Sequence, residues 1–175
     1  ATREALTRGH GLSDEYSNGN GSLMRILPLA FTAAGPSDIE AVSSITHAHA
    51  TSVEACQLYV DIARRLLKGE QLSEILSGLE TSKTYARLQT LAELTEDDIR
   101  SSGYVVDTLE AALWCLLTST SYAETVLKAV NLGDDTDTVA AVAGGLAGII
   151  YGLEGIPDNW LAQLRNKELL ESCLF

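Results

Sequence analysis

The 175-residue chain has few cysteines and few large aromatic residues. Its three cysteines, Cys56, Cys115 and Cys173, are far apart and form no CxxC pair, which argues against a disulfide framework or a zinc knuckle. Reduced thiols and a cytoplasmic protein are therefore expected. With only two Phe and two Trp, the core must consist mainly of Leu, Ala, Ile and Val, a composition that favours helices over aromatic-rich strands.

Positive charge is also scarce. Twelve basic residues stand against 24 acidic ones, a formal net charge of −12. Such a surface repels the phosphate backbone of nucleic acids and anionic lipid headgroups, so neither is an expected partner. We see no signal peptide, and the longest uncharged apolar run, residues 139–153, is shorter than the roughly 20 residues that a membrane span needs. A phosphate-bearing ligand would need a bound metal or backbone N–H groups to compensate the negative protein charge.

Strand-like alternation of apolar and polar residues is absent, and apolar residues recur at helical spacing instead. Ser37 and Glu40 have the spacing of a capping box. Helices are expected over residues 23–34, 37–48, 52–68, 72–79, 84–94, 105–117, 123–130 and 139–153, with one or two more after Pro157. We therefore predict an all-α fold and one domain over residues 1–175.

The helix expected at residues 139–153 is apolar on every face and contains Gly144, Gly145 and Gly148. Each glycine weakens a helix by roughly 1 kcal/mol relative to alanine, so close contact with neighbouring helices must compensate. This segment should be a central, buried helix.

The most informative motif is the acidic run Gly133-Asp134-Asp135-Thr136-Asp137-Thr138, directly before that helix. Its carboxylates and hydroxyls are hard oxygen ligands of the kind that Mg²⁺ or Mn²⁺ prefers. The alternative is a helix N-cap, for which Asp and Thr are also favoured. One cap suffices for one helix, however, and three neighbouring carboxylates repel each other unless a cation offsets their charge. The run therefore favours a metal site.

Two other interpretations of the acidic run can be tested by spacing. An EF-hand loop beginning at Asp135 would need glycine at its sixth position and glutamate at its twelfth, where the chain has Ala140 and Leu146. That interpretation fails. Residues 135–139 also resemble the nucleophile motif of haloacid-dehalogenase-type phosphatases, which follows a buried strand. Because residues 124–130 have a helical pattern, this remains a minor alternative.

Two further segments contain candidate ligand-binding residues. Ser17-Asn18-Gly19-Asn20-Gly21-Ser22 is glycine-rich and leads directly into an apolar helix, an arrangement that lets backbone N–H groups approach a phosphate. It could equally be a flexible surface turn. His47 could contact a ligand or simply end a helix. His49 lies two residues away, so both side chains are unlikely to face one metal on a helix.

Four segments, in this order, resemble the ADP-ribosylglycohydrolases of the dinitrogenase-reductase-activating type. They are residues 17–25 (SNGNGSLMR), Thr46-His47, residues 105–114 (VVDTLEAALW) and residues 131–152. Their order and spacing are similar to those of the C-terminal two-thirds of that family. The resemblance implies an all-helical, compact orthogonal bundle with a cleft that holds two Mg²⁺ or Mn²⁺ ions.

The resemblance also implies roles for individual residues. Asp135, Asp137 and Thr138 would be metal ligands, and the two aspartates the candidate catalytic residues. Asn18, Gly19, Asn20, Gly21 and Ser22 would contact the ADP-ribose diphosphate and the nearby ribose, and His47 would contact the ligand. The implied reaction is hydrolysis of the bond between C1 of the terminal ribose and a protein side chain or small acceptor. The expected partner is thus an ADP-ribosylated protein or a small ADP-ribosyl compound.

The chain departs from the family pattern in two ways. Many relatives have Gly-Gly before the Asp-Thr-Asp-Thr run, whereas this chain has Gly133-Asp134. The family's N-terminal part, which supplies a Thr/Ser-Asp-Asp metal motif and a Glu, has no counterpart in residues 1–14. We therefore expect an incomplete domain with half of the metal shell and little activity by itself. The alternative is a non-catalytic relative, either crystallin-like or ADP-ribose-binding.

Overall fold

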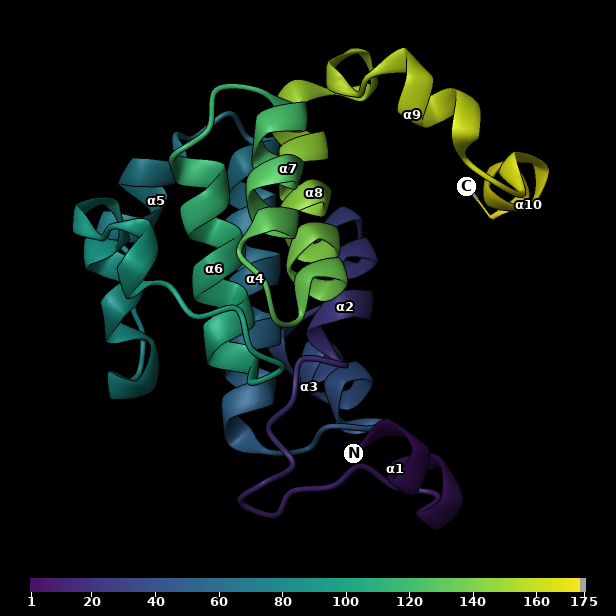
Figure 1. The fold of residues 1–175 in the computed structure, drawn as a ribbon. Helices are drawn as coiled ribbons and strands as arrows, with labels where there is room; N and C mark the ends of the chain where they lie inside the picture. The colour runs from purple at the N-terminus through teal and green to yellow at the C-terminus, as the bar shows by residue number, and fades with distance from the viewer. Residues whose placement is uncertain (174–175) are drawn as a thin grey trace.

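The computed structural model describes residues 1–173 (Figure 1). Its helices, with 3₁₀ segments written η, are α1 (Thr2–Arg8), α2 (Leu23–Ile26), η1 (Leu27–Phe31), α3 (Pro36–Ser44), α4 (Ala50–Leu67), α5 (Leu72–Ser77), η2 (Lys83–Glu93), η3 (Glu96–Asp98), α6 (Val105–Leu117), α7 (Tyr122–Asn131), α8 (Thr136–Tyr151), η4 (Leu153–Gly155), α9 (Asp158–Gln163) and α10 (Lys167–Ser172). Extended pairing within the described residues is limited to isolated bridges, Leu12 with His47 and Gly19 with Tyr104. The all-α prediction is confirmed.

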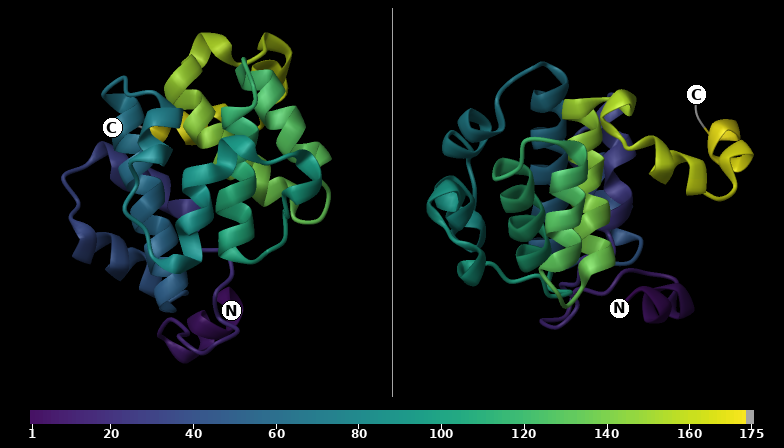
Figure 2. Two further views of the ribbon diagram at one scale, coloured as in Figure 1. Left: turned by 90° about the vertical axis from the view of Figure 1, so that its left-hand side faces the viewer. Right: turned by 45° about the horizontal axis from the view of Figure 1, so that its top comes forward.

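The core lies between α4, α6, α7 and α8, which pack lengthwise against one another (Figures 1 and 2). Helix α6 is buried on nearly every side, and its Leu109 and Leu113 are fully enclosed. The Trp114 Nε1–H on the same helix donates to the Leu94 carbonyl at 3.0 Å, which ties the segment after η2 to the bundle. As the composition indicated, leucine, alanine, isoleucine and valine supply most of this core.

Helix α8 contacts α2, α4, α6 and α7, so the prediction of a central helix is confirmed. Its burial is partial, because Ala141 and Ile150 on one face are exposed. A Cβ at Gly145 would lie 3.0 Å from the Tyr59 hydroxyl, which donates to the Val142 carbonyl at 2.7 Å. A Cβ at Gly144 would lie 3.3 Å from the Tyr122 hydroxyl. These two glycines let α4 and α7 each approach α8 closely, as expected. Gly148 differs, because a Cβ there would meet no atom within 4 Å.

Two helices expected from periodicity are wholly or partly 3₁₀ in form. The segment 23–34 is α-helical only as far as Ile26, and η1 follows. Pro28 lacks the N–H that would continue the α-helical ladder. The segment 84–94 is the 3₁₀ helix η2, which shows that apolar spacing alone does not separate the two helix types.

Helix α3 differs from the prediction at both ends. Its N-cap is Gly35, two residues before the predicted Ser37, because Pro36 takes the first helical position and the Asp38 carboxylate accepts from the Gly35 N–H at 2.7 Å. It ends at Ser44 rather than at Ala48. His47 therefore lies in the turn between α3 and α4, paired with the segment that follows α1.

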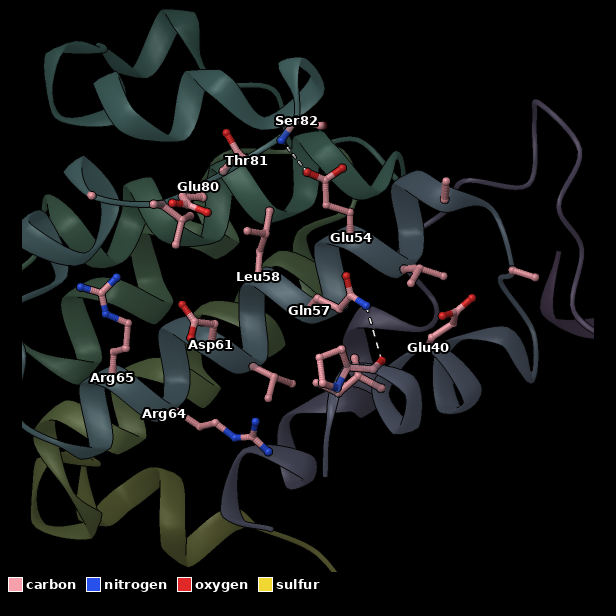
Figure 3. A pocket seen from close by; sticks show the side chains of 18 residues that line it. Glu40, Glu54, Gln57, Leu58, Asp61, Arg64, Arg65, Glu80, Thr81 and Ser82 are labelled. Carbon is pink, nitrogen blue, oxygen red and sulfur yellow. Dashed lines mark hydrogen bonds between the residues drawn. The ribbon is translucent and has the colours of Figure 1, made fainter. Parts of the chain in front are cut away.

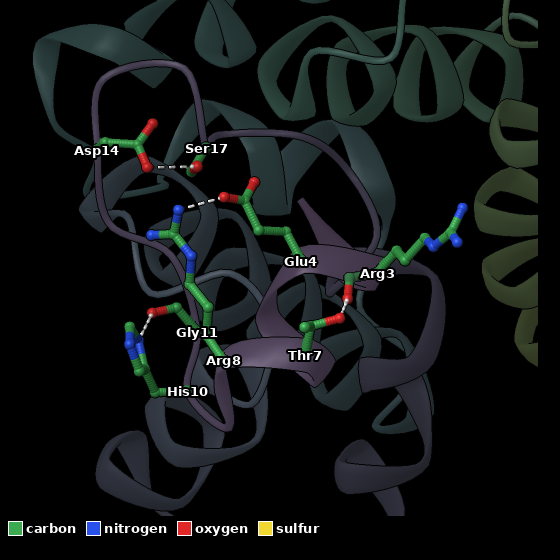
Figure 4. Close-up of polar contacts among 8 residues, drawn as sticks. All are labelled: Arg3, Glu4, Thr7, Arg8, His10, Gly11, Asp14 and Ser17. Carbon is green, nitrogen blue, oxygen red and sulfur yellow. Dashed lines mark hydrogen bonds and ion pairs between the residues drawn. The ribbon is translucent and has the colours of Figure 1, made fainter.

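That segment is held to the turn by a close backbone approach. A Cβ at Gly11 would lie 2.0 Å from the Ser44 carbonyl oxygen, so only glycine fits there. The Leu12 N–H donates to the Thr46 carbonyl at 3.2 Å. Around it, mainly exposed side chains make local contacts, including the Glu4–Arg8 ion pair and the bond from Ser17 Oγ to Asp14 Oδ2 at 2.9 Å (Figure 4). Further along the chain, Gly19 and Gly21 of the glycine-rich loop lie beside His47.

Helices α9 and α10 extend away from the bundle and contain no buried residue (Figures 1 and 2). Helix α9 still contacts the end of the bundle, because the Trp160 ring packs edge-to-face on the Tyr122 ring of α7, with 6.3 Å between ring centroids. All three cysteines are free, two of them buried and Cys173 exposed. Among residues 1–173, no helix combines the length and the apolar character needed to cross a bilayer.

Candidate functional site

Three loops meet at the lower end of the bundle in Figure 1, above α1. They precede α2, α6 and α8. The Asn20 N–H donates to the Gly103 carbonyl at 3.2 Å, and the Asp135 N–H donates to the Ser101 carbonyl at 3.0 Å. The loop before α6 thus holds the other two by backbone hydrogen bonds on either side. This arrangement brings the glycine-rich loop and the acidic run together.

The side chains of those two loops also meet. Asn20 Nδ2 donates to Asp135 Oδ2 at 2.6 Å and lies 2.9 Å from the Thr108 hydroxyl on α6. Thr138 donates from Oγ1 to the other carboxylate oxygen of Asp135 at 2.9 Å. Both oxygens of Asp135 are thereby oriented by neighbours. Asn20 and Asp135 are 115 positions apart in the chain, so only the fold brings them into contact.

Asp135 occupies the N-cap position of α8 but makes no capping hydrogen bond from its side chain to the helix backbone. Its carboxylate faces Asn20 and Thr138 instead. Gly133 and Asp134 precede it with φ of 88° and 56°, both in the left-handed region. This geometry favours a functional carboxylate over a simple cap. Helix α7 lies before the run, so the strand that a phosphatase motif requires is not there.

Helix α8 begins three residues earlier than predicted, which places Asp137 and Thr138 in its first turn. Thr138 is buried, whereas Asp137 is exposed and its carboxylate makes no hydrogen bond or ion pair within residues 1–173. Carboxylate and hydroxyl oxygens are suitable donors for a hard divalent cation. No group of three or more His, Cys, Asp or Glu side chains in that part of the chain could hold a metal ion. Asp135, Asp137 and Thr138 thus match a metal shell in donor type, but they do not complete one by themselves.

The side chains of the glycine-rich loop point in different directions. Asn18 donates from Nδ2 to the Glu15 carbonyl at 3.0 Å, within its own loop. Ser22 is buried and accepts from the Cys56 thiol at 3.5 Å. Of the predicted side chains in this loop, Asn20 is the one that reaches the acidic run. The Asn20 N–H is already used and Ser22 is fully buried, so the N–H groups of Gly19 and Gly21 are the ones in this loop that remain for an anion within the described residues.

His47 lies behind this loop and is 2% exposed. A Cβ at Gly21 would lie 2.7 Å from its Cε1 atom, so the ring packs directly on the loop backbone. Burial and the nearby positive charge of Arg25 lower the pKa of His47 to about 4, and the ring is neutral at pH 7. The structure places this residue as a buried support of the loop.

The sequence profile of the ADP-ribosylglycohydrolases matches residues 1–174. The chain belongs to the ADP-ribosylglycohydrolase family. It is 38% identical to an ADP-ribosylarginine hydrolase, Tri1, of Pseudomonas putida, covering 94% of this chain and 48% of the relative. It is 32% identical to the ADP-ribosyl-[dinitrogen reductase] glycohydrolase of Rhodospirillum rubrum, covering 87% and 53%.

A solved structure described as an ADP-ribosylglycohydrolase-related protein complex has a similar fold. Its TM-score is 0.82 at 32% identity, and the match covers 98% of this chain and 65% of that chain. The chain thus spans about half the length of the curated ADP-ribosylglycohydrolases that it matches.

Two polar residues beside the glycine-rich loop and the acidic run, Thr108 and Arg25, were not predicted as site residues from the sequence. Thr108 is fully buried and contacts Asn20, but it lies within the mainly apolar helix α6. Arg25 follows the glycine-rich loop and donates to the Gly21 carbonyl at 2.8 Å. Both lie inside the segments that resemble the family. That resemblance is the only sequence signal that could have pointed to them.

A separate groove of about 1140 Å³ lies between α3, α4 and the segment after α5 (Figure 3). It contains none of the predicted site residues. Several of its polar groups are engaged internally: the Ser82 N–H donates to Glu54 Oε1 at 2.8 Å, and Arg64 donates to three backbone carbonyls. Size alone therefore does not identify the functional site here.

Proposed function

We propose that the protein hydrolyses the glycosidic bond between ADP-ribose and an acceptor. One observation carries this proposal: the hydrogen bond from Asn20 to Asp135 joins the glycine-rich loop to the acidic start of α8. A hydrolase of a phosphorylated glycoside must hold an anion and a reacting sugar side by side, and the two segments supply the groups for each. Family membership supports the same reaction class.

The glycine-rich loop is the proposed diphosphate site. The open N–H groups of Gly19 and Gly21 attract an anion without adding a charged side chain, and buried Ser22 ends the loop behind them. This is useful in a protein with a net charge of −12. Asn20, held between Thr108 and Asp135, keeps the loop and the helix start at a fixed separation.

Asp135, Asp137 and Thr138 are the proposed ligands of Mg²⁺ or Mn²⁺, with further ligands needed to complete a two-metal shell. When bound, such ions orient ribose hydroxyls and lower the pKa of a water for attack at C1. The chain's own contribution is orientation. Asn20 and Thr138 fix both carboxylate oxygens of Asp135, and exposed Asp137 leaves a second carboxylate accessible.

Arginine is the first acceptor to test, because the Pseudomonas putida relative is named an ADP-ribosylarginine hydrolase. Serine-linked and small-molecule acceptors are the alternatives. The experiment uses the natural gene product with defined ADP-ribosyl linkages and titrates Mn²⁺ by calorimetry. Replacing both aspartates, Asp135→Asn with Asp137→Asn, should abolish Mn²⁺ binding and lower kcat/KM by at least about 100-fold.

The matched control is Asp134→Asn, which removes a neighbouring exposed carboxylate that contacts neither Asn20 nor Thr138. It should retain both Mn²⁺ binding and activity. Unchanged Mn²⁺ affinity in the double variant would show that the metal site is elsewhere. ADP-ribose binding without hydrolysis of any linkage would favour the non-catalytic alternative.

A further inference from the structure

Behind the glycine-rich loop, three polar side chains form a continuous hydrogen-bonded chain, with Arg25 half-buried and Thr46 and His47 buried. Arg25 Nη2 donates to Thr46 Oγ1 at 2.6 Å, and Thr46 Oγ1 lies 2.7 Å from His47 Nδ1. The same guanidinium donates from Nη1 to the Gly21 carbonyl at 2.8 Å. Thr46 and His47 are 3% and 2% exposed. Arg25 therefore links the loop to the turn that carries the histidine.

The direction of these hydrogen bonds follows from which groups can donate. A guanidinium has only donors, so Thr46 Oγ1 must accept from Arg25. The buried Thr46 hydroxyl hydrogen then needs an acceptor, and within residues 1–173 His47 Nδ1 is the one in reach. If Nδ1 carried the proton instead, that hydroxyl hydrogen would be buried without a partner, which is costly. Nδ1 is thus the acceptor.

The opposite edge of the ring faces the loop. A Cβ at Gly19 would lie 3.6 Å from Nε2, and one at Gly21 would lie 3.3 Å from it. Nε2 has no hydrogen-bond partner in the described part of the chain. The residue is only 2% exposed, but Nε2 itself is not fully enclosed by protein, so this nitrogen is open to a ligand atom at the edge of the glycine-rich loop, and to water when no ligand is bound.

We propose that Arg25 and Thr46 fix His47 as the neutral tautomer with its proton on Nε2, so that the ring offers one more N–H donor to an acceptor oxygen of the ligand held by the glycine-rich loop. Arg25 and Thr46 are positioning residues that act through His47. The identity of the ligand as ADP-ribose rests on the proposed function. The tautomer does not, because it follows from contacts within the protein alone.

The tautomer is tested on the protein labelled with ¹⁵N-histidine, by long-range ¹H–¹⁵N correlation spectra at pH 7. Wild type and Thr46→Ser should show His47 protonated on Nε2 with Nδ1 unprotonated. Thr46→Val removes the hydroxyl at similar volume, and its two ring nitrogens should move toward the averaged shifts of mixed tautomers. A wild-type signal from protonated Nδ1 would overturn the proposal, as would an unchanged spectrum in Thr46→Val.

Binding of ADP-ribose, measured by calorimetry, supplies the second readout. Thr46→Val should bind about five- to tenfold more weakly, whereas Thr46→Ser should bind as wild type does. Ser43→Ala is the control, because it removes a buried hydroxyl from the same turn that donates to the His47 carbonyl and does not touch the ring. It should change neither the spectrum nor the affinity.

The two readouts separate the two claims. If wild type shows the Nε2–H tautomer and binds no ADP-ribose, the proposed function fails and the tautomer assignment stands. If wild type binds ADP-ribose and Thr46→Val binds it equally well, the role of Thr46 is refuted and the proposed function stands.

Discussion

The two sides of the glycine-rich loop are built differently. On one side, His47 is almost completely buried, and its ring packs on the Gly21 backbone. On the other side, Asp135 is half-buried and Asp137 is exposed, and the run is reached through two residues with left-handed backbone. The first side is fixed by internal packing and hydrogen bonds. The second presents carboxylate oxygens at the surface.

This difference indicates a division of work around one loop. A loop whose shape is set before binding loses little conformational entropy when the ligand arrives. Groups that must bind a cation or a sugar, in contrast, have to stay accessible. Substitutions on the His47 side should therefore change stability and loop shape together. Those on the Asp135 side should change ligand or metal binding with small effects on stability.

The largest stability effect should come from the pH dependence of His47. Its pKa is about 4 in the folded protein, against an ordinary value of 6.5. Between these values the unfolded chain binds more protons than the native state, so stability falls as pH falls from 6.5 to 4. The free energy of unfolding should decrease by up to about 3 kcal/mol from this group.

The check is urea unfolding of wild type and His47→Gln at several pH values from 7 to 4. Glutamine cannot be protonated, so the variant should have a flatter pH profile, and the difference between the two curves isolates His47. Parallel curves would mean that the ring titrates alike in both states. The His47 side would then not be the rigid one.

A smaller effect should follow from adding one methyl group to the loop. In Gly21→Ala the new Cβ would lie 2.7 Å from His47 Cε1, and the ring is held in place by Thr46. We expect a loss of about 2 kcal/mol in unfolding free energy, together with weaker ADP-ribose binding.

Gly19→Ala is the matched control in the same loop. Its nearest atoms would be 3.6 Å away, which is ordinary contact, so the cost in unfolding free energy should stay below about 0.5 kcal/mol. Both variants are measured by urea unfolding. Equal costs would show that the His47 ring moves freely and does not constrain the loop.

Features of the fold and the site could be predicted from the sequence where neighbouring residues determine them, and could not where they depend on contacts between distant segments. The acidic run and the helix after it were recognised from local chemistry, and their helical context is confirmed. Helix ends were less certain. Asp and Thr are favoured both in loops and in the first turn of a helix, so α8 was placed three residues late. Prediction of α3 past Ser44 put His47 at a helix end rather than in a turn.

Contacts between distant segments were beyond local patterns. Nothing near Asn20 specifies that its amide meets Asp135, and nothing near Thr108 marks it as more than a helix residue. The burial of His47 follows from packing against Gly21, which tertiary structure alone reveals. The resemblance grouped these segments as one site, and the fold shows which of their atoms meet.

The smallest effects should come from the backbone that leads into α8. Gly133 has φ of 88°, so Gly133→Ala should cost about 1 kcal/mol in unfolding free energy.

Asp134 has φ of 56°, and Asp134→Gly relieves strain while adding freedom to the unfolded chain, so its net change in unfolding free energy should stay within about 0.5 kcal/mol. Mn²⁺ affinity should not change in Asp134→Gly, because this carboxylate contacts neither Asn20 nor Thr138. Weaker Mn²⁺ binding there would make Asp134 a ligand and shift the metal site toward the strained turn, away from the first turn of α8.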